Sequence, residues 1–192
     1  MDTNKIKRKG VFKSPFSVFS VVKGFNVRRK DKEITDKNEI EDILSSAMVG
    51  RLGTCANGIP YITPMNFTYD KETSKIFLHC ANEGRKLENI RINQTVCFEV
   101  EEVTNVLVKQ PTCASSVAYR SVILFGSIKI LTDLNAKNDA LQKLANKYAP
   151  QNHKAPFTDA MLNKTSVLEI EIKKMTAKRS PVKPAITDPS KK

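Results

Sequence analysis

The chain has 192 residues and a mass of 21.5 kDa, a size that suits one globular domain and leaves little room for two cores. It contains no run of about 18 uninterrupted apolar residues, which excludes a membrane-spanning helix. The net charge of +12 gathers in basic ends, 1–30 and 173–192, and the part between them is slightly acidic, so nucleic acid is not the expected partner.

The first predicted elements are a helix and a hairpin. Asp36 followed three residues later by Glu39 forms a capping-box pattern, and the apolar residues after it recur at helical spacing, which predicts a helix over 36–47. Residues 49–70 predict two strands joined by a turn at Ala56-Asn57-Gly58. Pro60 and Pro64 lack a backbone N–H, so the second strand is expected at a sheet edge.

The middle of the chain alternates short strands and one helix. A strand is predicted over 75–80, then a turn and a short helix that carries Leu87 and Ile90 on one side, then a strand over 95–101. Residues 101–116 show no clear period and are expected to form a loop.

The last third predicts a long strand, a helix and a final strand. The strand over 117–130 places six residues on one face: Ala118, Val122, Leu124, Gly126, Ile128 and Ile130. An amphipathic helix is predicted over 135–148, before Pro150, and an alternating strand over 166–175. Six strands and three helices indicate a mainly β fold, a small closed or half-closed antiparallel barrel with helices packed around it.

The cysteines and histidines predict no metal site. Cys55, Cys80, Cys97 and Cys113 show no C-x-x-C spacing, and His79 and His153 lie far apart in the sequence. Reduced cysteines are therefore expected. In the first 22 residues, Lys13 and Pro15 interrupt the apolar stretch and no small-residue cleavage site follows, which favours a cytoplasmic protein over an exported one.

Two adjacent cations give the sharpest chemical signal. Arg85 and Lys86 stand at the predicted start of a helix, where the helix dipole disfavours positive charge. A phosphate bound there would resolve the conflict, because Gly84 lets backbone N–H groups approach an anion and Asn82 can add a donor. The alternative is a solvated basic helix start, screened by the neighbouring acidic residues Glu83 and Glu88.

Two further residues are candidates on weaker grounds. Arg120 falls on the apolar face of its strand, so it needs a partner, either a glutamate in a core ion pair or a bound anion. His79 lies near the end of its strand, just before the basic turn, and is either a packed histidine or a site residue, in which case it is the candidate catalytic residue.

Several segments together carry a family resemblance. They are RRKDKEITD (28–36), VGRLGTCANGIPYITPMNF (49–67), FLHCANEGRKLENIR (77–91), VCFEV (96–100) and YRSVILFGS (119–127). With these, the chain resembles the FMN-binding split-barrel proteins related to pyridoxamine 5′-phosphate oxidase, in particular the branch of nitroimidazole-resistance (Nim-type) proteins. The resemblance spans residues 27–179, which we expect to be the domain, with a flexible basic extension over 1–26 and a basic tail over 180–192.

The resemblance implies a six-stranded antiparallel split barrel that forms a homodimer and binds FMN at the subunit interface. By the same match, Arg85 and Lys86 would hold the FMN phosphate beside Gly84. The residues expected beside the isoalloxazine, the ribityl chain or the substrate are Pro64, Met65, Asn66, Phe67, His79, Cys80, Ala81, Tyr119, Arg120 and Ser121.

The expected activity is transfer of electrons or hydride from reduced flavin to a small planar acceptor, as in nitroimidazole reduction. A non-catalytic flavin or haem carrier is the alternative, and the family also includes deazaflavin binders. The chain has no Trp and lacks the C-terminal Arg and His signature of authentic pyridoxamine 5′-phosphate oxidases, so pyridoxamine 5′-phosphate is not the expected substrate.

Overall fold

The computed structural model describes residues 26–108, 110–149 and 156–180. Residues 1–25 of the basic extension expected over 1–26, residues 181–192 of the tail expected over 180–192, and His153 lie outside these residues. Eight strands form one antiparallel sheet in the order β3-β2-β6-β7-β8-β5-β4, with β1 added against β8. The strands are β1 (Glu33–Ile34), β2 (Gly50–Ala56), β3 (Ile59–Met65), β4 (Phe67–Asp70), β5 (Lys75–Ala81), β6 (Thr95–Leu107), β7 (Ser116–Leu131) and β8 (Thr165–Ser180).

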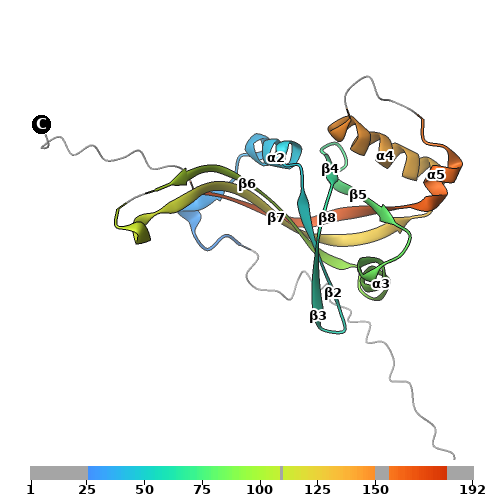
Figure 1. The fold of residues 1–192 in the computed structure, drawn as a ribbon, viewed down its shortest axis with the longest axis horizontal. Coiled ribbons are helices and arrows are strands. Elements are labelled where there is room, and N and C mark those ends of the chain that lie inside the picture. The colour runs from blue at the N-terminus through green and yellow to red at the C-terminus, as the bar shows by residue number, and fades with distance from the viewer. Residues whose placement is uncertain (1–25, 109, 150–155, 181–192) are drawn as a thin grey trace, which may run out of the picture.

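The sheet curves without closing, which agrees with the expected split barrel (Figure 1). Its strand number differs from the expected six for two reasons. β1 has only two residues, too few to show a period. The second hairpin strand breaks at Asn66 into β3, which pairs with β2, and β4, which pairs with β5. Because of this break, the segment 59–70 pairs with β2 in its first half and with β5 in its second half.

The β2–β3 hairpin follows its sequence signals. Asn57 and Gly58 both have positive φ, 53° and 79°, as a tight hairpin turn requires. β3 pairs on one side only, so Pro60 and Pro64 lie on an edge strand as predicted.

The loop expected over 101–116 is wrong for most of its length. β6 continues to Leu107 and pairs with the start of β7, and η2 (Thr112–Ala114) fills the turn between them. The register shifts between Val103 and Asn105, so one extra residue breaks the alternation that would have revealed the strand. Pairing with β7 supplies the hydrogen bonds that local pattern did not predict.

Four α-helices flank the sheet, one more than expected: α2 (Lys37–Ser46), α3 (Arg85–Ile92), α4 (Leu134–Tyr148) and α5 (Asp159–Lys164). Asp36 caps α2 by accepting a hydrogen bond from the Asn38 N–H at 2.9 Å. Glu39 pairs instead with Arg179 of β8 at 2.5 Å, so it ties α2 to the sheet rather than completing the capping box.

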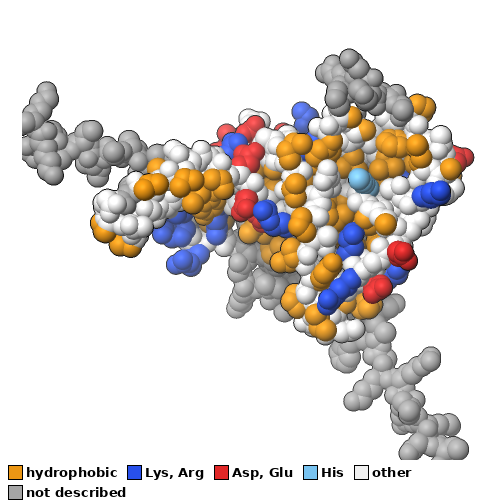
Figure 2. Space-filling model, viewed as in Figure 1, with side chains coloured by type: hydrophobic (Ala, Val, Ile, Leu, Met, Phe, Trp, Pro, Cys, Tyr) orange, Lys and Arg blue, Asp and Glu red, His pale blue; other side chains and the backbone are white. Residues whose placement is uncertain are grey.

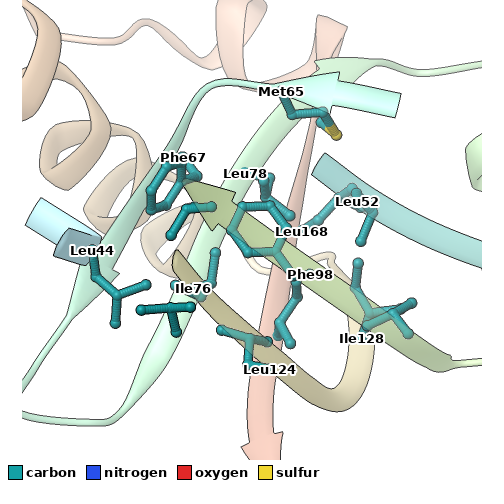
Figure 3. Close-up of a cluster of buried hydrophobic side chains, with 14 of the residues drawn as sticks. Leu44, Leu52, Met65, Phe67, Ile76, Leu78, Phe98, Leu124, Ile128 and Leu168 are labelled. Atoms are coloured by element: carbon teal, nitrogen blue, oxygen red, sulfur yellow. The ribbon is translucent and has the colours of Figure 1, made fainter. Parts of the chain in front are cut away.

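The main core fills the barrel and is covered by α2 and α3. Phe67 and Phe98 meet edge to face at its centre, with ring centroids 5.1 Å apart (Figure 3). A second cluster lies between α4, α5 and the outer face of β5 and β8, and includes Phe77, Leu141 and Val167. Successive residues of β5 therefore face different clusters.

None of the helices within the described residues combines the length and apolar character that a membrane crossing needs. Within the same residues no group of histidine, cysteine and carboxylate side chains has the arrangement of a metal site.

Candidate functional site

Helix α3 is fixed to strand β2 by buried contacts. Leu87 and Ile90 are buried in the main core. The buried Asn89 amide donates to the Thr54 hydroxyl at 3.0 Å, and the Asn93 amide donates to the Cys55 carbonyl at 3.0 Å. The first turn of α3 thus has a defined position on the barrel.

That first turn begins at Gly84 and has no side-chain cap. Gly84 has φ 122°, a conformation that L side chains rarely adopt, and a Cβ built on it would meet nothing within 4 Å. The first N–H groups of a helix have no partners inside it, and this holds for those of Arg85 and Lys86, which directly follow Gly84. The geometry leaves room for an acceptor group directly over the helix start.

The two predicted cations flank this opening. The Arg85 guanidinium lies over the Tyr61 ring, 4.9 Å from its centroid. Lys86 is half-buried and its charge acts on Cys80, where burial raises the thiol pKa and Lys86 opposes that rise. Among the ion pairs of the described residues none involves Arg85 or Lys86. Arg85 is exposed, which the solvated alternative also expects, so both interpretations of the two cations stand at this point.

Asn82 has a different role from the donor expected. Its amide donates to the Asn163 carbonyl at 2.8 Å, and its side-chain oxygen accepts from the Ser166 hydroxyl at 2.9 Å. Both bonds hold the turn before α3 against α5 and β8. Asn82 therefore stabilises the turn that precedes Gly84.

These features fit a phosphate group. Free N–H groups at a helix start, an open glycine and two unneutralised cations are the donor set that a phosphate dianion takes. The buried Thr63 hydroxyl, on the same face of β3 as Tyr61, also lacks a hydrogen-bond partner within the described residues. We name Gly84, Arg85, Lys86 and Tyr61 the α3 cradle.

Asn66 and His79 meet in a separate cavity of about 380 Å³ between β5 and the helices α4 and α5. The imidazole is open to solvent on one side, and in Figure 2 a histidine side chain is visible among apolar side chains. The cavity walls remove enough water to lower the pKa of His79. The lowered pKa favours the neutral form of His79, which can both donate and accept a hydrogen bond.

The neighbours of Asn66 and His79 in sequence have other surroundings. Met65 and Phe67 are buried in the main core, with exposed fractions of 7% and 0% (Figure 3). Pro64 is exposed on the edge strand, and Ala81 is exposed at the end of β5. The side chains of Met65 and Phe67 thus support the fold at this point, whereas Asn66 between them faces a cavity.

Arg120 lies on the core face of β7 as predicted and takes the ion-pair alternative. Its guanidinium bonds to Asp42 of α2 at 2.7 Å and to Glu102 of β6 at 2.6 Å, and these hydrogen bonds raise its pKa. Its buried Nε has no hydrogen-bond partner within the described residues. Within one chain Arg120 therefore contacts α2, and α2 and α3 lie apart on the sheet (Figure 1).

Tyr119 and Ser121 lie on the opposite face of β7 from Arg120. Ser121 lines a cavity of about 210 Å³. Phe125 lines both this cavity and a larger, mainly apolar cavity of about 550 Å³. The larger cavity runs beneath Tyr61 and along β2 and β6. The two cavities therefore meet at Phe125, and Tyr119 lines neither of them.

Two aromatic residues were missed by sequence reasoning. Tyr61 contacts Arg85. The available signal was strand alternation, which places Tyr61 on the same face of β3 as Met65, a residue already expected at the site. The Tyr148 hydroxyl accepts from the Phe67 N–H at 2.8 Å and lies within hydrogen-bond distance of the Phe67 and Met48 carbonyl oxygens. Tyr148 lies in the helix predicted over 135–148, but local patterns could not reveal its partners because they are remote in sequence.

The family model of pyridoxamine 5′-phosphate oxidase matches residues 36–179 of this chain. Those residues contain the α3 cradle, the cavity with His79 and the whole of β7. A search of the curated proteins finds no match.

Several solved structures share the fold. A candidate 5-nitroimidazole antibiotic resistance protein from Bacteroides thetaiotaomicron is 26% identical, with a TM-score of 0.68 over 77% of this chain and 86% of that one. The flavocytochrome Anf3 from Azotobacter vinelandii is 20% identical, with a TM-score of 0.71 over 81% and 72%. The FAD and heme binding protein from Mycobacterium smegmatis is 22% identical, with a TM-score of 0.70 over 78% and 73%.

Proposed function

Because this chain belongs to the pyridoxamine 5′-phosphate oxidase family, we propose that it is an FMN-binding oxidoreductase that passes electrons to a small planar acceptor. The flavin, when bound and reduced, supplies the hydride or electrons. The chain's own residues bind the phosphate, orient the cofactor and limit access of water.

One observation carries the proposal. Arg85 and Lys86 flank an uncapped helix start, and none of the ion pairs in the described residues neutralises them. Unneutralised cations at a helix N-terminus are unfavourable unless an anion joins them. The terminal phosphate of FMN, a dianion near neutral pH, would satisfy both side chains and the free N–H groups. Tyr61 would hold the Arg85 guanidinium toward it.

Replacing both cations by alanine tests the phosphate role. The double variant Arg85→Ala/Lys86→Ala should lose FMN, measured as flavin absorbance per chain after gel filtration. A matched double variant, Lys71→Ala/Arg91→Ala, removes two exposed cations outside the cradle and should keep its flavin. Stoichiometric flavin on the Arg85→Ala/Lys86→Ala protein would remove the proposed role.

A homodimer is part of the proposal. Ile62 on edge strand β3 and Val103 and Val106 on β6 are large apolar side chains with exposed fractions of 66%, 62% and 63%. The 550 Å³ cavity, with Tyr61 and Ile62 in its lining, also lies open on this side of the sheet. A second copy that covers these surfaces would bury apolar area beside the α3 cradle, and so would place the cofactor at the interface.

The oligomeric state tests the dimer directly. Ile62→Glu should halve the mass measured by light scattering, because a buried unpaired carboxylate disfavours the interface. Ile92→Glu, a change at an exposed apolar residue at the end of α3, serves as the control. A monomeric mass for the unchanged protein would remove the dimer from the proposal.

A non-catalytic carrier of flavin or haem is the second candidate. His79 favours it, because its imidazole lines a cavity and makes no hydrogen bond to other described residues, and a free imidazole is a common haem ligand. The absorbance spectrum of the purified protein distinguishes flavin from haem. Anaerobic reduction with dithionite followed by a nitroaromatic distinguishes catalyst from carrier, since a carrier would leave the flavin bleached.

A further inference from the structure

Both ends of the described chain attach to one part of the sheet. Strand β1 pairs with the last residues of β8. Lys174 of β8 donates a hydrogen bond to the side-chain oxygen of Asn26 at 3.2 Å, and Lys32 donates to the hydroxyl of Ser180 at 3.2 Å. The residues before 26 and those after 180 are therefore joined to the domain in the same region.

The chain at Asn26 has a fixed position. Val27 is buried, with an exposed fraction of 3%. Asn26 and Val27 line the cavity of about 210 Å³ together with Thr176 and Lys178 of β8. Residues 28–32 are therefore held between this packed point and strand β1, which follows them directly.

Positive charge gathers in this region. Residues 26–33 and 174–180 carry seven lysine and arginine residues and two acidic residues. We name these two segments the basic pole. In Figure 2 lysine and arginine side chains lie together below the strands β6 and β7, on the left of the view. Such an excess of one sign on a small surface attracts a partner of opposite charge.

The domain itself neutralises part of the basic pole. Its two acidic residues, Asp31 and Glu33, pair with Arg29 at 2.5 Å and with Lys30 at 2.7 Å. Arg179 pairs with α2. The cations of the basic pole for which the described residues provide neither an ion pair nor any other charged partner are Arg28, Lys32 and Lys178. These three are available to an external anion.

The sequence outside the described residues has the same sign of charge. Residues 1–25 carry six cations and one acidic residue, and residues 181–192 carry three cations and one acidic residue. Together with the basic pole they account for the whole net charge of +12, because residues 34–173 carry sixteen cations and sixteen acidic residues. Since both segments attach at the basic pole, an anionic partner bound there can meet the cations of all three.

Residues 1–25 also contain an apolar stretch between two lysines. None of the nine residues between Lys13 and Lys23 is charged, and most are Phe or Val. Nine residues are too few to cross a bilayer, which takes about 20. Apolar residues beside a group of cations are typical of segments that bind the surface of an anionic bilayer. There the cations meet the headgroups and the apolar side chains enter the boundary with the acyl chains.

A nucleic acid fits this composition less well than a lipid surface does. Its phosphates would bind the cations, and phenylalanine rings could stack on its bases. Val18, Val21 and Val22 have no aromatic face for stacking and would remain in water. A lipid surface takes up both kinds of apolar side chain, so the valines favour lipid.

We propose that the basic pole and residues 1–25 bind the surface of a bilayer that contains anionic phospholipids. Arg28, Lys32 and Lys178 meet the lipid headgroups, and the apolar residues of the segment 11–22 enter the boundary between headgroups and acyl chains. The inference goes beyond the proposed function, and the α3 cradle takes no part in it.

Co-sedimentation of the full-length chain with lipid vesicles tests the proposal. In about 100 mM NaCl, vesicles of phosphatidylcholine with about 30% phosphatidylserine should bind the protein at least tenfold more tightly than vesicles of phosphatidylcholine alone. Binding should weaken as the salt concentration rises, because salt screens the headgroup charge. Lack of binding to the anionic vesicles, or equal binding to both kinds, would overturn the inference.

A matched pair of variants tests the position of the charge. Arg28→Gln/Lys178→Gln removes two cations of the basic pole and should weaken binding to the anionic vesicles by about tenfold. Lys71→Gln/Arg91→Gln removes two exposed cations elsewhere, for the same net charge, and should leave binding unchanged. Equal binding of the two variants would show that total charge alone matters and would overturn the inference. The vesicle comparison on the unchanged protein needs no variant, so it stands if Lys178→Gln disturbs β8.

The variant Phe16→Ser/Phe19→Ser distinguishes a lipid surface from a soluble polyanion. It keeps every cation and should weaken binding to the anionic vesicles, while its binding to duplex DNA stays unchanged. Vesicle binding as tight as that of the unchanged protein would assign the basic pole to a polyanion such as nucleic acid and would overturn the inference.

Flavin content, measured on the same samples, separates this inference from the proposed function. Protein that carries FMN and does not bind anionic vesicles removes the lipid surface alone. Protein that binds the vesicles but takes up no FMN removes the proposed function and leaves the lipid surface standing.

Discussion

The guanidinium carbon of Arg85 lies 4.9 Å from the centroid of the Tyr61 ring, so helix α3 and edge strand β3 are joined by a cation–π contact. The two residues come from elements that share no backbone hydrogen bond. The contact places a charged group of the helix start beside the 550 Å³ cavity that Tyr61 lines. Tyr61 thus contacts the helix start and also lines that cavity.

Tyr61→Leu should weaken FMN binding, because the Arg85 guanidinium loses the ring that orients it. A cation–π contact at a partly exposed site contributes roughly 0.5–1 kcal/mol, so a rise in the FMN dissociation constant of about two- to fivefold is expected. Fluorescence titration of the flavin measures it. Tyr61→Phe keeps the ring and is the control; an unchanged affinity in Tyr61→Leu would contradict the role.

Arg120→Ala should lower stability, since Asp42 and Glu102 lose their shared partner. Loss of a partly buried hydrogen-bonded charge of this kind costs about 1–3 kcal/mol in the free energy of unfolding. Urea unfolding measures it, with Arg179→Ala, whose pair with Glu39 is more exposed, as the control. A larger effect on flavin affinity than on stability would instead assign Arg120 to the cofactor.

Gly126→Ala should disrupt the pairing of β7 with β8. A Cβ at this position would overlap the Glu171 carbonyl oxygen and lie 2.9 Å from a methyl group of Ile170. The backbone must shift at a point where the register is already irregular, and a loss of about 1–3 kcal/mol in the free energy of unfolding is expected. Gly53→Ala is the matched control, because its Cβ would come no closer than 3.4 Å to any atom considered. Similar melting temperatures for the two variants would contradict the clash.

Lys147 should make stability rise with pH in alkaline solution. Burial lowers the pKa of Lys147 from its usual 10.5 to about 8, while its Nζ donates to the Leu44 carbonyl at 3.1 Å and lies 3.7 Å from the Phe67 ring centroid. Between pH 8 and 10.5 the unfolded chain binds the proton that the folded chain has released, so the free energy of unfolding increases with pH.

The Lys147→Met variant isolates this contribution. The free energy of unfolding of the unchanged protein minus that of Lys147→Met should increase from pH 8 to pH 10.5 and stay level below pH 8. Urea unfolding at several pH values measures the difference. A difference that is flat across the whole range would show that the folded pKa of Lys147 is not lowered.

Much of the fold and the centre of the candidate site were predictable from local patterns. The cap at Asp36, the turn at Asn57-Gly58, the periods of the helices and the two cations at the start of α3 each lie within a few residues of one another. Backbone sterics, capping and the helix dipole act over that range, so the sequence alone revealed both the elements and the charge anomaly at Arg85 and Lys86.

Tertiary structure decided the partners. Tyr148 reaches the backbone of Phe67 across 81 positions of sequence, Arg120 finds Asp42 across 78, and β6 extends because β7 pairs with it. A one-residue step along β5 sends His79 to one cavity and Cys80 to the opposite face. Such contacts depend on which distant strands and helices pack together, and the burial of apolar surface that selects this packing is a property of the whole chain.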